Sequence, residues 1–71
     1  MRILGIDCGT ERTGFGLIDS DGRKHALIDA GVIRSSAKLA LEFRLAGIAT
    51  DLRRILTAYA PETVAVEEVF H

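Results

Sequence analysis

One long amphipathic segment near the middle of the chain constrains the fold more than any other feature. Apolar side chains recur along it at steps of three and four: Leu41, Leu45, Ile48, Leu52, Ile55 or Leu56, and Tyr59. This spacing predicts a helix with one apolar stripe. The helix is expected to end before Pro61, because the residue preceding a proline is disfavoured in helical geometry. Ser35 and Ser36 offer side chains for capping its N-terminus.

Strand-like runs lie on both sides of the helix. Arg2–Asp7, Thr13–Asp19 and His25–Ile33 precede it, and Thr63–Val69 follows it. Asp21-Gly22 between the second and third runs favours a β-hairpin with a type I′ turn, in which both central residues need positive φ. The helix is long enough to act as a crossover that returns the last strand parallel to an earlier one. The order strand-strand-strand-helix-strand therefore predicts an α/β chain with a mixed sheet.

The length of the chain leaves one face of this sheet without a helix. Its 71 residues make at most one small domain. A bare apolar sheet face is a site of association. The simplest interpretation is that residues 1–71 are part of a larger domain and that the fold is incomplete at the C-terminus.

Charge and cysteine content limit the classes of function. Nine Lys and Arg against ten Asp and Glu give a net charge of -1, whereas nucleic-acid-binding domains usually carry a basic excess. The lone Cys8 excludes an intramolecular disulfide and fits a reducing compartment. No apolar stretch is long enough to span a bilayer, so we expect no membrane association and a cytoplasmic location.

Acidic side chains end two of the strand-like runs. Asp7 ends the first, and Glu67 and Glu68 end the last. If the crossover sets these strands side by side, Asp7 and one glutamate meet at one edge of the sheet. Two carboxylates held close repel each other unless a cation lies between them. Such oxygen ligands suit Mg²⁺, and a pair of ions can stabilise the attacking and leaving oxygens of a phosphodiester.

Two questions about these acids stay open at this point. Neighbours on a strand point to opposite faces, so only one of Glu67 and Glu68 can face Asp7, and spacing does not decide which. The alternative role for Asp7 is to cap the backbone of the turn at Gly9-Thr10.

Glycines and a few other residues carry weaker signals. The run TGFGLID holds two glycines, which weaken a strand and often mark close approach by a ligand or another segment. Residues 9–14, GTERTG, imitate the start of a phosphate loop, but Phe15-Gly16 stands where Lys-Ser/Thr is required. Cys8 is interpreted as a small core residue. Phe70 is interpreted as a core or terminal anchor, or as an aromatic that stacks on nucleic acid.

Two stretches resemble a known family. They are ILGIDCGTERTGFGLI (residues 3–18) and PETVAVEEVF (residues 61–70). Together they resemble the N-terminal part of the RuvC family of Holliday junction resolvases. The resemblance implies a ribonuclease H-like fold, with residues 1–71 as the N-terminal part of a nuclease domain. It also implies a homodimeric endonuclease that nicks four-way DNA junctions symmetrically with Mg²⁺ or Mn²⁺, in recombination and repair, beside a branch-migration helicase.

The resemblance also implies roles for individual residues. Asp7 matches the family's first catalytic, metal-binding carboxylate and Glu67 matches the second. Phe70 matches an aromatic residue near the junction centre that helps to open base pairs. Cys8 stands where the family usually has proline. The family's remaining catalytic aspartates lie on a C-terminal helix that residues 1–71 do not include, so we expect these residues alone not to cut DNA.

Three rival interpretations share part of the pattern. An actin-like ATPase or sugar kinase fragment would use Asp7 and the Gly9–Gly16 hairpin to bind Mg-ATP. A YqgF-type ribonuclease H-like protein shares the first stretch but not AVEEVF. A non-enzymatic remnant would only fold or bind, and a titration that shows no metal binding would favour it.

Overall fold

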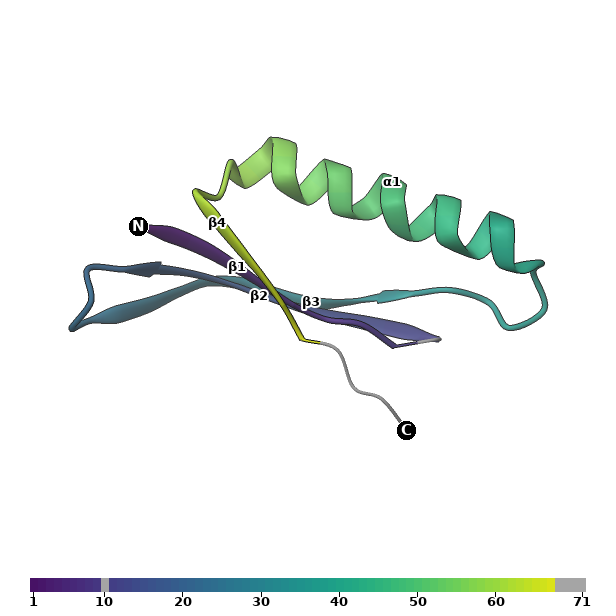
Figure 1. Ribbon diagram of the computed structural model, residues 1–71, viewed down its shortest axis with the longest axis horizontal. Helices are drawn as coiled ribbons and strands as arrows, with labels where there is room; N and C mark the ends of the chain where they lie inside the picture. Colours follow the sequence, from purple (N-terminus) through teal and green to yellow (C-terminus); the bar gives the residue numbers. More distant parts are fainter. Residues whose placement is uncertain (10, 68–71) are drawn as a thin grey trace.

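The computed structural model describes residues 1–9 and 11–67. Its elements, in chain order, are β1 (Arg2–Asp7), β2 (Arg12–Ser20), β3 (His25–Arg34), α1 (Leu41–Tyr59) and β4 (Thr63–Glu67). The strands form one layer, and α1 lies across one face of it (Figure 1). This arrangement confirms the predicted order of elements, and among the described residues the other face carries no helix.

The sheet has the strand order β3-β2-β1-β4. β1 pairs antiparallel with β2, which pairs antiparallel with β3, so the first three strands form the predicted meander. β4 pairs parallel with β1, which confirms α1 as a crossover. The turn between β1 and β2 includes Gly9, where an added Cβ would collide with the carbonyl oxygen of Arg12.

The core lies between the sheet and α1. Leu4 and Leu17 are register partners on β1 and β2 and have no exposed surface. Ile33 on β3 is 6% exposed, and Thr13 on β2, its register partner, is 2% exposed. The fully buried part of the interior is therefore small and belongs to the three strands of the meander.

Polar contacts tie the C-terminal end of α1 to three strands. The Tyr59 hydroxyl donates a 2.7 Å hydrogen bond to Oδ2 of Asp29 on β3, which raises the pKa of Tyr59. Nη1 of Arg2 on β1 donates to the Tyr59 carbonyl at 3.0 Å. Nε of Arg2 also lies 3.1 Å from Oδ1 of Asp19 on β2, and this hydrogen bond lowers the pKa of Asp19. These bonds identify the face with Arg2 as the helix side of the sheet.

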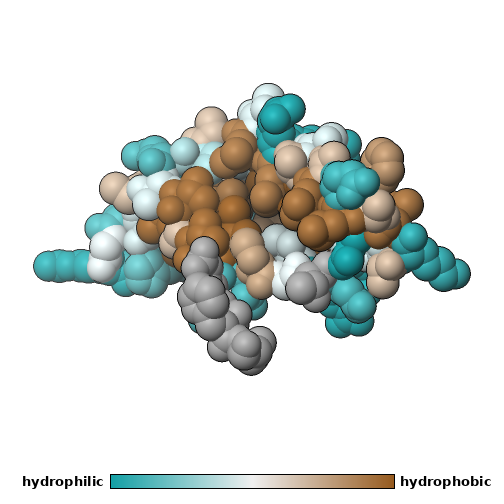
Figure 2. Space-filling view, turned by 45° about the vertical axis from the view of Figure 1, so that its right-hand side comes forward, coloured by the Kyte–Doolittle hydropathy of each residue, from teal (hydrophilic) through white to brown (hydrophobic). Residues whose placement is uncertain are grey.

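The predicted apolar stripe of α1 is covered only in part. Ile48, Leu52, Ile55 and Tyr59 are half-buried, whereas Leu41 and Leu45 are 63% and 56% exposed. Figure 2 shows apolar side chains gathered in a broad band on the molecular surface. The described residues contain no second helix to cover this side of α1, so the N-terminal part of the stripe stays in contact with water.

The predicted serine caps of α1 are wrong. The N-cap residue is Ala40, which makes no side-chain cap. Ser36 instead closes a separate turn, in which its hydroxyl accepts from the Lys38 amide at 3.2 Å and its carbonyl from the Leu39 amide at 3.1 Å. At the other end the helix stops as predicted before Pro61, with Ala60 in the left-handed conformation at φ 45°.

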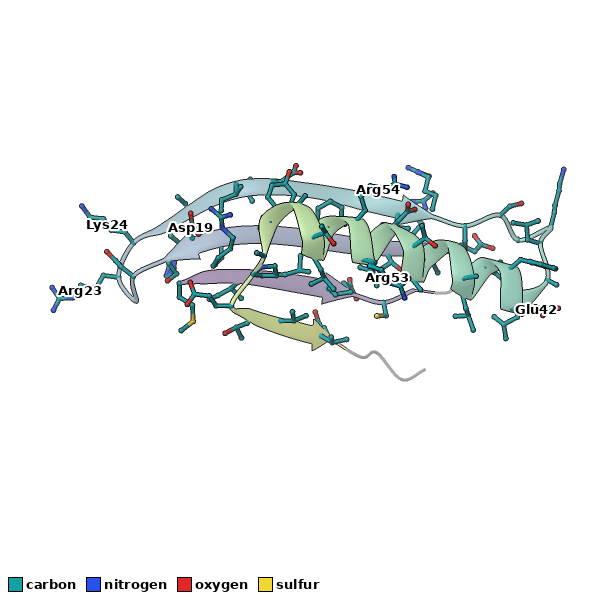
Figure 3. All side chains as sticks on the ribbon, turned by 90° about the horizontal axis from the view of Figure 1, so that it is seen from above. Asp19, Arg23, Lys24, Glu42, Arg53 and Arg54 are labelled. Atoms are coloured by element: carbon teal, nitrogen blue, oxygen red, sulfur yellow. The ribbon has the colours of Figure 1, made fainter. Side chains whose placement is uncertain are left out.

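The hairpin between β2 and β3 is confirmed, but the predicted type I′ turn is wrong. Gly22 has φ 93°, whereas Asp21 does not have positive φ. Oδ1 of Asp21 accepts hydrogen bonds from the backbone amides of Lys24 at 2.7 Å and Arg23 at 2.8 Å. These bonds lower the pKa of Asp21. The side chain of Asp21 thus organises a longer loop, from which Arg23 and Lys24 project at one end of the molecule (Figure 3).

Candidate metal and nucleic-acid site

The parallel pairing of β1 and β4 brings two carboxylates together. Asp7 and Glu67 are register partners at the ends of these adjacent strands. Register partners in a sheet project to the same face, and both side chains are exposed. The spacing argument had left Glu67 and Glu68 as alternatives, and the register shows that Glu67 shares a face with Asp7. Glu68 lies outside the described residues.

The carboxylate pair lies on the face of the sheet opposite α1. Arg2 and Leu4 belong to the helix side, as the bond from Arg2 to the end of α1 shows. Side chains alternate along a strand, so Gly5 and Asp7 project to the open face. The packed core and the candidate site are therefore on opposite sides of a single layer of strands.

A shallow trough of about 560 Å³ runs over this part of the open face. Its lining comes from the C-terminal halves of β1 and β4 and from the adjoining part of β2: Gly5, Ile6, Asp7, Gly14, Phe15, Gly16, Ala65, Val66 and Glu67. Gly5 pairs with Gly16 on one side and with Ala65 on the other, and Asp7 pairs with Gly14. The trough therefore has a floor of backbone and one methyl group, with both carboxylates in its lining.

The donor set fits a hard divalent cation only in part. Asp7 and Glu67 supply carboxylate oxygens, which Mg²⁺ prefers, and this ion is commonly held by one or two carboxylates together with substrate phosphate. Within residues 1–9 and 11–67 no group of three or more His, Cys, Asp or Glu side chains is placed to hold a metal. The described residues thus provide two ligands, and any further ones must come from elsewhere.

Other residues singled out in the sequence have mixed outcomes. Within the described residues Asp7 makes no hydrogen bond to Gly9, and Thr10, the other residue of the turn that Asp7 was expected to cap, lies outside the described residues. Cys8 is exposed, which corrects its interpretation as a core residue, because β1 ends one residue before it. Phe70 lies outside the described residues. Gly5, which lines the trough, is not among the residues singled out from the sequence, where its signal is a glycine inside an apolar strand.

Comparison with known proteins identifies relatives over the whole chain. The family model described as crossover junction endodeoxyribonuclease RuvC matches residues 3–71. The protein of that name from Koribacter versatilis is 45% identical over 73 residues, which cover all of this chain and 43% of the relative. Its namesake from Methylorubrum populi is 47% identical over 70 residues, covering 99% of this chain and 37% of the relative. The chain thus spans less than half the length of these relatives, and matches their N-terminal part.

Solved structures agree with this match. RuvC of Thermus thermophilus superposes with a TM-score of 0.89 at 31% identity, over all of this chain and 45% of that chain. The same protein in complex with a Holliday junction substrate gives a TM-score of 0.90 at 30% identity, over all of this chain and 46% of that one. The Aquifex aeolicus PPX-GPPA enzyme gives 0.72 at 14% identity over 93% of this chain, which is a likeness of fold alone.

These comparisons confirm the predicted ribonuclease H-like α/β fold. They do not favour the ATPase, sugar kinase or YqgF-type interpretation, since the family match at high identity is to a different group of proteins. Within residues 1–9 and 11–67, the structure also has no helix that is long and apolar enough to cross a lipid bilayer.

Proposed function

Because the chain belongs to the RuvC family of crossover junction endodeoxyribonucleases, we propose that it forms part of an enzyme that resolves four-way DNA junctions by paired symmetric nicks. The observation that carries this proposal is the register pairing of Asp7 with Glu67 on the open face of the sheet. One residue of slippage in this register would send the Glu67 side chain to the helix side.

In this proposal, Asp7 and Glu67 are catalytic residues and metal ligands for Mg²⁺ or Mn²⁺. Divalent metal ions, when bound there, would activate a water molecule and stabilise the leaving oxygen of the phosphodiester. The protein's own part is to hold two carboxylates on paired strands, where the backbone ladder fixes their separation. Dependence on a divalent metal, a general property of nucleases of this family, supports the proposal.

The trough gives the two carboxylates access to a large substrate. Its floor is open to solvent and borders both side chains, so both carboxylates can be reached from outside the described residues. Four-way junction DNA is the substrate we propose, because a RuvC protein with the same fold is known in complex with a Holliday junction.

The remaining parts of the proposal rest on family membership. We propose that the complete protein acts as a homodimer, since paired symmetric nicks need two sites, and that it acts with a branch-migration helicase. Phe70 is proposed to contact DNA near the junction centre. A cytoplasmic location is proposed because the lone Cys8 fits a reducing compartment.

The proposal is tested by nicking of a synthetic four-way junction by the complete protein in the presence of Mg²⁺. Asp7→Asn and Glu67→Gln should each reduce the rate by more than about 100-fold, because losing a metal ligand removes several kcal/mol of transition-state stabilisation. Glu42→Gln is the matched control. Glu42 is an exposed carboxylate in the first turn of α1 (Figure 3), and its replacement should leave the rate unchanged.

Two results would contradict the proposal. One is full junction nicking by Asp7→Asn protein, and the other is equal nicking of the junction and of linear duplex DNA of the same sequence. The 71-residue chain by itself is expected to show no metal-dependent nicking, because two carboxylates do not complete a two-metal site.

A further inference from the structure

Two arginines face each other across neighbouring strands near the carboxylate pair. Arg12 begins β2 and Arg34 ends β3, and the two are register partners. Register partners in a sheet project to the same face, and both residues are exposed. Like charges directly opposite each other on paired strands destabilise a sheet. The fold therefore gives no reason for arginine at both positions.

No carboxylate among residues 1–9 and 11–67 forms an ion pair with these arginines. The two ion pairs in this part of the chain lie at the other end of β1 and β2 and within α1. The side chains of Arg12 and Arg34 also make no hydrogen bond to another described residue. An anion that neutralises the pair must therefore come from outside the described residues.

The arginine pair lies close to the candidate metal site. Gly14 on β2 is the register partner of Asp7, and Arg12 comes two residues before Gly14 on the same strand, so it projects to the same face. Two residues along a strand span roughly 7 Å, and the next strand lies about 4.8 Å away. Both arginines are outside the lining of the trough, so they flank the carboxylates instead of sharing the metal position.

We propose that Arg12 and Arg34 together bind a phosphate group next to the scissile one in the substrate strand. This inference rests on the proposed nuclease function and makes the two arginines positioning residues. Each DNA strand carries a phosphate about every 3.4 Å along the helix axis, so a strand with one phosphate at Asp7 and Glu67 has others within a similar distance. Guanidinium groups bind phosphate through two parallel hydrogen bonds. The pair also gives a chain with a net charge of -1 a local cationic contact for a polyanion.

The test is binding of the complete protein to a synthetic four-way junction, without divalent metal ions, over a series of salt concentrations. The logarithm of the affinity falls with the logarithm of the salt concentration, with a slope of about -0.9 for each phosphate contacted. The double variant Arg12→Gln/Arg34→Gln should bind about 10-fold more weakly, with a slope less steep by about 1. The matched control is Arg23→Gln/Lys24→Gln, which removes the same charge from the loop at the other end of β2 and β3 (Figure 3). It should change neither quantity.

A stability measurement distinguishes a DNA phosphate from a carboxylate elsewhere in the complete protein. Without DNA, the urea midpoint of Arg12→Gln/Arg34→Gln protein should be unchanged or higher, because repulsion within the pair is removed. A lower midpoint would overturn the inference, since it would mean that the arginines pair with acidic side chains of the protein. An unchanged salt slope, while Asp7→Asn protein is inactive, would also overturn it and leave the proposed function in place. Nicking by Asp7→Asn protein would instead overturn the proposed function itself.

Discussion

Replacing Gly31 by alanine should destabilise the protein, whereas the same replacement at Gly16 should not. The two glycines lie on the neighbouring strands β3 and β2, and neither has positive φ. A Cβ on Gly31 would lie 2.9 Å from Cε1 and 3.0 Å from Cζ of Phe15, but a Cβ on Gly16 meets nothing within 4 Å. Carbon atoms pack at about 3.5–4.0 Å, so the Phe15 ring must move by roughly 0.5–1 Å.

The magnitudes follow from this geometry. Overpacking costs about 1–3 kcal/mol, and we expect the lower half of that range because the far edge of the ring can tilt. Alanine in a compatible conformation gains about 0.4–1 kcal/mol by restricting the unfolded chain. The free energy of unfolding should therefore fall by about 0.5–1.5 kcal/mol in Gly31→Ala and rise by about 0.4–1 kcal/mol in Gly16→Ala.

Thermal unfolding followed by circular dichroism measures this difference. For a domain of 60–100 residues, each kcal/mol corresponds to about 4–8 °C in the melting temperature, so the two variants should be clearly separated on either side of the original protein. Equal melting temperatures would refute the reasoning, because they would mean that the Phe15 ring is not held over Gly31.

Three further predictions concern the helix side of the sheet and the hairpin loop. Leu17→Ala should lower the free energy of unfolding by about 2–5 kcal/mol, because a fully buried side chain is lost, while Leu27→Ala, at a side chain 70% exposed, should change it by less than about 0.5 kcal/mol; urea midpoints check both. The hydrogen bond to Asp29 raises the pKa of Tyr59, so its stabilising effect is complete below the ordinary value of 10.0 and is lost as pH rises through the folded value. Tyr59→Phe should lack this alkaline loss in unfolding experiments across that range. Backbone hydrogen bonds lower the pKa of Asp21, so its contribution to stability is present above pH 3.8, the ordinary pKa, and is lost as pH falls through the folded value. In Asp21→Ala protein the free energy of unfolding should therefore fall less steeply as pH is lowered, which urea unfolding across this range measures.

The sequence predicted the order and direction of the elements well, because apolar periodicity, a proline and crossover geometry each allowed a single interpretation. The stripe that ends at Tyr59 and the proline at residue 61 located the end of α1, and crossover geometry then required β4 to run parallel to an earlier strand. Local polar chemistry was harder to predict. Ser36 can cap a helix or close a turn with nearly the same hydrogen bonds, and the carboxylate of Asp21 outweighed the turn type that Asp-Gly favours.

The sequence predicted which chemical groups form the candidate site, but not how they are arranged. Strand ends with acids indicated a carboxylate pair, and the family resemblance pointed to Glu67. Spacing alone could not choose between Glu67 and Glu68, because that choice needs the register, which depends on how the whole crossover folds. The trough could not be predicted for the same reason. Gly5, Gly14 and Gly16 become neighbours only once β1 and β2 are paired, and single glycines in a sequence do not reveal that they share a face.

The position of Glu67 on β4 links the chemistry of the site to local unfolding. All five residues of β4 are exposed, and segments with few buried contacts open at a lower free energy than the core. A ligand held by both Asp7 and Glu67 binds only while β4 is paired with β1, so its binding free energy adds to the stability of that strand. Amide hydrogen exchange along β4 should therefore slow as the site fills. Ligand affinity and the free energy of opening β4 are therefore thermodynamically linked: a change that makes β4 open more readily also weakens binding of the ligand.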